Sequence, residues 1–130
     1  MNTSEIRQAV SRLCAERNII EQELLKTRNK MVRGSIVPQM RKCSLANCSK
    51  CTKGEKHGPF LYLSTVINGK SIHKYIGKEK DNQLVSSLKR YKAFKDNISR
   101  INKIHKELGS LWQQYREQLT VEITDNGLAL

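Results

Sequence analysis

The sequence lacks both a long apolar run and the start of a secreted protein. No run of apolar residues approaches the roughly 20 that a membrane-spanning helix needs, which argues against an integral membrane protein. Residues 1–5 have neither the basic start nor the apolar stretch of a secretion signal. We therefore expect a cytoplasmic chain with reduced thiols. In that compartment, clustered cysteines indicate metal ligands before disulfides.

Acidic side chains are scarce in the middle of the chain. The 130 residues carry 24 Lys and Arg against 12 Asp and Glu, a formal net charge of +12. Residues 26–106 hold 20 of the basic residues but only 4 of the acidic ones, whereas residues 1–25 and 107–130 are slightly acidic. The whole positive excess therefore lies between these ends. This concentration of positive charge favours polyanionic partners, above all nucleic acid.

The few carboxylates of the basic segment also argue against an enzyme. They are Glu55, Glu79, Asp81 and Asp96, and they do not form the clustered set that a metal-dependent nuclease or transposase uses. The chain has no Gly-rich phosphate loop and no serine or cysteine nucleophile in a recognisable setting. We therefore predict a protein that is not an enzyme.

The first of two helical patterns lies at the N-terminus. Apolar residues recur at steps of three and four between Ile6 and Met31, which predicts an amphipathic helix within residues 1–33. Gly34 and Pro38 are expected to end it.

The second pattern lies nearer the C-terminus and predicts a helix in residues 81–119, with Asp81 as its N-cap. Residues 120–130 carry little helical signal and are expected to form a tail. The heptad seam of this helix consists of Tyr91, Phe94, Ile98, Ile101, His105, Leu108, Trp112, Tyr115 and Leu119.

Two helices with narrow apolar stripes must bury them against something. We expect them to pack on each other, so that His105 and Trp112 lie in the core. The predicted fold is mostly α, with two long helices forming an antiparallel coiled-coil stalk and residues 34–80 forming a small zinc-stabilised β-hairpin head. A coiled-coil dimer is the alternative arrangement.

A cysteine cluster marks the expected head. Cys43, Cys48 and Cys51 are spaced C-x4-C-x2-C, and His57 follows closely. Zn²⁺ takes four such ligands in a tetrahedron, and three thiolates with one imidazole form a closed, structural site. We predict a structural zinc ion on these four residues, with His73 as the reserve fourth ligand. Reduced free thiols or a redox-labile pair are the alternatives.

A β-hairpin is predicted after the cysteines. Asn68-Gly69 between two β-rich runs is a strong hairpin signal, because both turn positions need a positive φ. Taking these two residues as the loop places Tyr62 opposite Tyr75. One face then carries Leu61, Leu63, Thr65, Ile72 and Ile76, and the other carries Tyr62, Ser64, His73 and Tyr75. The second face suits a DNA groove or stacking on unpaired bases, or its tyrosine pair merely stabilises the hairpin.

The segment around the hairpin also resembles a known family. The residues that carry the resemblance are Cys43, Cys48 and Cys51, the run Gly54-Glu55-Lys56-His57-Gly58-Pro59-Phe60-Leu61-Tyr62-Leu63, then Asn68-Gly69-Lys70 and Tyr75-Ile76-Gly77-Lys78. They are similar to an uncharacterised family of short bacterial and archaeal proteins, described only as a domain of unknown function. The resemblance covers about residues 40–95. It implies an association with mobile elements and their recombinases or transposases.

These observations together predict a non-enzymatic nucleic-acid-binding accessory protein, with DNA favoured over RNA, that acts with a mobile-element recombinase or transposase. The alternatives are an RNA-binding module and a coiled-coil adaptor or transcriptional regulator. A homodimer through the helices is a further expected partner arrangement. The predicted nucleic-acid contacts are Arg33, Arg41, Lys42, Lys53, Lys56, Tyr62, Lys70, His73, Lys74, Tyr75, Lys78, Lys89 and Arg90.

Overall fold

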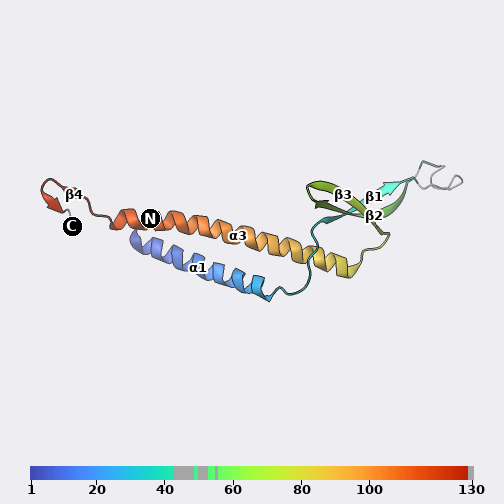
Figure 1. Cartoon of the computed structure of the whole chain (residues 1–130). Helices are drawn as coiled ribbons and strands as arrows, with labels where there is room; N and C mark the ends of the chain where they lie inside the picture. The colour runs from blue at the N-terminus through green and yellow to red at the C-terminus, as the bar shows by residue number, and fades with distance from the viewer. Residues whose placement is uncertain (43–48, 50–52, 55, 129–130) are drawn as a thin grey trace. The chain divides into compact units, whose positions relative to one another are not determined.

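The computed structural model describes residues 1–42, 49, 53–54 and 56–128. It divides into two compact units: a helical unit, Met1–Arg28 with Phe94–Leu130, and a sheet unit, Asn29–Ala93. The elements, shown in Figure 1, are α1 (Thr3–Lys26), β1 (Ser35–Arg41), β2 (His57–Ile67), β3 (Lys70–Gly77), α3 (Asn82–Leu119), β4 (Ile123–Thr124) and β5 (Gly127–Leu128).

Both helices begin at a side-chain cap. The Asn2 carboxamide oxygen accepts a hydrogen bond from the Glu5 amide at 2.8 Å, and Asp81 accepts one from the Gln83 amide at 2.9 Å. Asp81 is thus confirmed as a capping residue, because it satisfies an amide with no partner inside the helix. At its other end α1 stops at Lys26, where Thr27 turns to extended backbone, rather than continuing to residue 33.

The helical unit is held together by an apolar contact between α1 and the C-terminal part of α3. Its core consists of Ile6, Ala9, Leu13, Ile20, Ile104, Leu108 and Leu111. The two segments lie side by side and antiparallel (Figure 1), since Glu16 bonds to Arg100 while Glu23, further along α1, bonds to Asn97. Ile6 and Ile104 are fully buried at this contact.

α1 covers only part of the predicted heptad seam of α3. Of that seam, Ile98, Trp112 and Leu119 are 43%, 54% and 57% exposed, and His105 is exposed as well. The buried side chains of α3 are Ile104, Leu108 and Leu111. Leu108 belongs to the predicted seam, whereas Ile104 and Leu111 lie beside it on the helix surface. The prediction that His105 and Trp112 lie in the core was therefore wrong. Both rows have apolar residues at steps of three and four, and tertiary packing selects between them.

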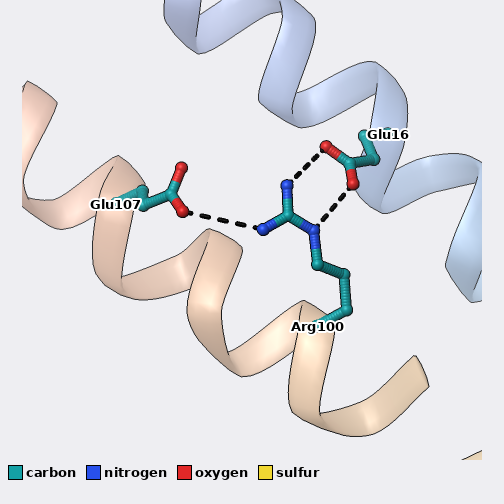
Figure 2. Close-up of polar contacts among 3 residues, drawn as sticks. All are labelled: Glu16, Arg100 and Glu107. Atoms are coloured by element: carbon teal, nitrogen blue, oxygen red, sulfur yellow. Dashed lines mark hydrogen bonds and ion pairs between the residues drawn. The ribbon is translucent and has the colours of Figure 1, made fainter. Parts of the chain in front are cut away.

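A bidentate ion pair crosses the same contact. Arg100 donates from Nε and Nη2 to the two carboxylate oxygens of Glu16 at 2.7 and 2.8 Å, and its Nη1 lies 3.6 Å from Glu107 (Figure 2). The hydrogen bonds from Arg100 lower the pKa of the Glu16 carboxyl below its ordinary value. The pair thus favours the charged form of Glu16 in the folded chain.

The lowered pKa of Glu16 predicts an acid-sensitive contribution to stability. A carboxyl whose pKa is depressed on folding stabilises the fold above its unfolded pKa and loses that effect as the pH falls through the folded one. Replacing Glu16 with Gln should lower the melting temperature at neutral pH, and the difference from the unsubstituted chain should vanish in acid. Melting curves across this range measure it. Glu21→Gln, which removes a carboxylate 3.6 Å from Arg17 on the same helix, is the control and should show a smaller difference.

The sheet unit is built on a three-stranded antiparallel sheet in the order β1-β2-β3 (Figure 1). Pro38 lies opposite Leu61 in β1, and a proline is tolerated there because β1 is an edge strand. Leu61 on the central strand is buried. The segment that leads into β1 is tied to the start of α3, because the Val32 amide donates to the Ser87 carbonyl at 3.1 Å.

The predicted fold class was wrong. The chain is a mixed fold of helices and a three-stranded sheet, not a mostly α stalk with a single hairpin, because β1 adds a third strand. α1 meets α3 along its predicted apolar row, with Ile6, Leu13 and Ile20 buried, but α3 buries only part of its own predicted seam, so the contact is not the predicted coiled coil. Within the described residues, no group of three or more His, Cys, Asp or Glu side chains could hold a metal ion. Residues 123–128 also form the short pair β4-β5 rather than only a tail.

Candidate nucleic-acid interface

The turn of the β2-β3 hairpin sets which side chains share a face. Asn68 and Gly69 adopt φ values of 50° and 78°, as the Asn-Gly signal predicts. The observed pairs include Ser64 with His73 and Tyr62 with Tyr75, which confirms the predicted register. Since paired residues point to the same side of a sheet, the two tyrosines and His73 lie on one face.

The strand that sequence reasoning missed brings a cation to this face. In β1, Val37 pairs with Tyr62 and Gln39 with Phe60, and a register shift between Gln39 and Arg41 follows. The Arg41 guanidinium carbon then lies 4.6 Å from the centroid of the Phe60 ring and 5.6 Å from that of Tyr62. At these distances a cation is attracted to the ring face.

The resulting surface is a cluster of rings with cations beside it, and we call it the aromatic face. It consists of Arg41, Phe60, Tyr62, Tyr75 and Lys78. The Tyr62 and Tyr75 ring centroids are 5.5 Å apart with an interplanar angle of 59°, and those of Phe60 and Tyr75 are 6.3 Å apart at 54°. The Lys78 ammonium is 5.9 Å from the Phe60 centroid. Tyr75 remains 46% exposed, so the cluster is open to solvent.

Basic residues gather at one end of the sheet. β1 and β3 end where β2 begins, because Arg41 pairs with His57 and Leu61 with Gly77. The exposed lysines that immediately flank these strand ends are Lys42, Lys56 and Lys78. None of the three strands contains an Asp or Glu, and Glu79, directly after Lys78, is the acidic residue that the structure places next to this end. We call these three lysines together with Arg41 the basic end.

The other predicted contacts lie elsewhere. Lys70 and Lys74 pair with Ile67 and Leu63, which places both lysines on the face opposite the rings. Lys89 and Arg33 are exposed outside the sheet, and Lys53 is exposed between residues that the structure does not describe. The strand pairing therefore places some of the predicted nucleic-acid contacts on the aromatic face and others on the opposite face or outside the sheet.

Arg90 has a structural partner. Its Nε and Nη2 donate to the Lys30 carbonyl at 3.1 and 3.0 Å, and Nη2 also donates to Ser87. These bonds tie the segment before β1 to α3. Beside them lies a polar hollow of about 490 Å³ lined by Asn29, Lys30, Asn82, Gln83, Ser86, Ser87 and Arg90.

Phe60 is the functional candidate that sequence reasoning did not place on a face. It lies two residues before Tyr62 on the same strand, so the alternation of β-strand side chains could have identified it. Arg41 was predicted from its charge alone. Arg41 lies above the rings because β1 pairs with β2. The sequence did not predict β1, because Pro38 in its middle argues against a strand.

The predicted zinc ligands fall mostly outside the structure. Cys43, Cys48 and Cys51 are not among the described residues. His57 is the first residue of β2, half-buried, and paired with Arg41. His73, the reserve ligand, lies within β3 on the side of the aromatic face. The zinc site stays a prediction.

Comparison with known proteins identifies a family. Searches of curated proteins and of solved structures gave no significant match. In the part of the chain that the structure describes, neither helix has the length and apolarity needed to cross a bilayer. One family model, the domain of unknown function DUF6788, matches residues 10–85. This match includes most of α1, the whole sheet and the start of α3, and it extends over more than half of the sequence. The chain therefore belongs to the DUF6788 family.

Proposed function

We propose that this chain is a cytoplasmic, non-enzymatic protein that binds nucleic acid through the aromatic face. The observation that carries the proposal is the position of Arg41 above Phe60 and Tyr62, beside the half-exposed Tyr75. Exposed rings can contact bases while neighbouring cations contact phosphates, so one surface provides both kinds of contact.

Charge supports the same proposal. The basic end lies next to the rings, and the strands between them contain no acidic side chain that would repel phosphate. The positive excess of the sequence also lies within residues 26–106, which include the whole sheet. A polyanion is therefore the partner that this surface would attract most strongly.

DNA is the proposed nucleic acid, and RNA is the alternative. The preference for DNA rests on the sequence resemblance to proteins that accompany mobile elements, and a recombinase or transposase is the proposed protein partner. A structural zinc ion on Cys43, Cys48, Cys51 and His57 is also part of the proposal. Thiolates and an imidazole are ligands that Zn²⁺ prefers, and such a closed set would supply structure rather than chemistry.

A second candidate function, a protein–protein adaptor, is favoured by one observation. In the helical unit, Ile98, Trp112 and Leu119 are exposed at heptad spacing on α3, with the exposed His105 between the first two. Large exposed apolar side chains in one row are typical of protein contacts. Adaptor function predicts binding that does not depend on salt and does not need the aromatic face.

Binding to DNA tests the proposed function. Affinity for a labelled DNA fragment should fall steeply as salt increases, because neutralised phosphates release counterions. Replacing Arg41 with Gln should weaken binding about 3- to 10-fold and reduce the slope of log K against log salt by about 1. Fluorescence anisotropy at several salt concentrations measures both quantities.

The matched control is Lys74→Gln. It removes the same charge from the same sheet but from the face opposite the rings. Its affinity should stay within about twofold of the unsubstituted chain, because Lys74 points away from the rings and cannot contact a phosphate of a strand bound on them. Equal losses for the two variants, or no DNA binding at any salt concentration, would contradict the proposed interface.

A further inference from the structure

We infer that the aromatic face binds unpaired bases of a single strand rather than a groove of duplex nucleic acid. The inference rests on the proposed function and names its ligand more closely. It depends on three features of the sheet unit: the number of strands, the orientation of its rings, and the position of its cations.

The first feature is the width of the sheet. The major groove of B-DNA, about 12 Å wide, admits one helix or a two-stranded ribbon. β1 adds a third strand beside β2, and strands lie about 4.8 Å apart, so the backbones alone span about 10 Å before side chains are added. Phe60 and Tyr62 lie on the central strand, where both edges are already paired. An edge strand of the sheet that entered the groove would therefore not carry these rings to the bases.

The second feature is what the face offers to a base. Direct readout in a groove needs donors and acceptors aimed at base edges. This face has His73 and the tyrosine hydroxyls as polar groups, but most of its ordered contacts are between rings, which are tilted at 54° and 59° to one another, with the Arg41 guanidinium carbon 4.6 Å from the Phe60 centroid. Bases within a duplex are already stacked and expose only their edges. Unpaired bases expose their faces, which stack on aromatic rings and on arginine planes.

The third feature is the position of the cations. Arg41, Lys42, Lys56 and Lys78 lie at one end of the sheet rather than along both sides of the rings. One strand passing over the sheet can place its phosphates near this end while its bases lie on the rings. The second strand of a duplex would have no matching cations within the described strands of this face. Tyr75 is the exposed ring of the cluster, and Phe60 and Tyr62 are half-buried, so we expect the face to stack about one or two bases.

The test compares single strands with their duplexes, using the full chain. The probes are fluorescein-labelled oligodeoxyuridylate and oligouridylate of about 12 nucleotides, which differ only in the 2′-hydroxyl, each alone and annealed to its complement. We expect each single strand, or at least one of them, to bind about tenfold more tightly than its own duplex. Whichever strand binds more tightly identifies the sugar that the face accepts.

Substitutions at Tyr75 separate stacking from charge. Tyr75→Leu keeps an apolar side chain but removes the ring, and it should weaken single-strand binding about 5- to 100-fold while leaving duplex binding within about twofold. Tyr75→Phe keeps the ring and should retain single-strand binding. Trp112→Leu removes an exposed ring from the helical unit and is the matched control, with no expected effect. Circular dichroism of each variant verifies that its sheet and helices are intact.

Two outcomes overturn the inference while leaving the proposed function standing. These are duplex binding as tight as single-strand binding, and equal losses for Tyr75→Leu and Tyr75→Phe. Absence of binding to every probe contradicts the proposed function itself, so the two failures are distinguishable. The comparison of single strand with duplex needs no variant, and it holds even if a substitution at Tyr75 unfolds the sheet.

Discussion

Ile104→Ala should destabilise the chain by about 2 to 5 kcal/mol. Ile104 is fully buried against α1 in the core of the helical unit, where Ile6 is the other fully buried side chain. Truncation removes three carbons from a packed interface, and the two helices cannot close the cavity without moving their backbones. Unfolding in urea, followed by helical circular dichroism, measures the loss as a lower midpoint.

Ile98→Ala is the matched control, because it makes the same chemical change on the same helix. Ile98 is 43% exposed, and alanine is the better helix former, so this variant should change stability by no more than about 0.5 kcal/mol. The pair of variants decides which apolar row of α3 is the core. A larger loss for Ile98→Ala than for Ile104→Ala would show that the predicted seam, not the observed one, faces α1.

The second large effect is expected at Gly34, immediately before β1. Its φ is +140°, which side chains rarely adopt, and an added Cβ would lie 2.6 Å from the Ser64 carbonyl oxygen. The Leu63 Cδ1 and Thr65 Cβ atoms would lie at 3.1 and 3.2 Å. The contact at 2.6 Å is with backbone of the central strand, so it is relieved only by moving β1 away from β2. Gly34→Ala should therefore cost about 3 kcal/mol or more from backbone strain and the clash together.

Gly34→Ala should also weaken nucleic-acid binding, because β1 carries Arg41 to the aromatic face. The control is Gly109→Ala, which adds the same methyl group in α3, where it would meet no atom within 4 Å beyond its own stretch of helix. In a helix interior this change should stabilise by about 0.5 to 1 kcal/mol. Thermal unfolding of both variants, together with their affinity for DNA, gives the comparison. Unchanged stability of Gly34→Ala would show that β1 is not seated against β2 as described.

Features set by neighbouring residues could be predicted from the sequence. The Asn68-Gly69 turn determines the hairpin register within a few residues of itself, because only left-handed backbone closes a two-residue loop with the right twist. From that register the pairing of Tyr62 with Tyr75 follows directly. The cap at Asp81 is equally local, since it depends on the amide of Gln83.

The features that the sequence did not reveal depend on distant partners. β1 has a proline in its middle and is stable as a strand only because β2 lies beside it, so its pattern could not be recognised alone. The core row of α3 was equally hidden. Ile101, Leu108 and Tyr115 belong both to the predicted seam and to the side that packs against α1, and the residues between them decide the difference.

The candidate interface combines features that the sequence determines with features that depend on the tertiary structure. Composition and the hairpin pattern were enough to determine that the middle of the chain is basic and that two tyrosines share a face of a β-hairpin. Tertiary structure alone decided that Arg41 lies above Phe60 and Tyr62 and that three strands stand where two were expected. The physical reason is distance along the chain. Turn geometry and charge act between neighbouring residues, whereas strand pairing and ring contacts require segments that only folding brings together.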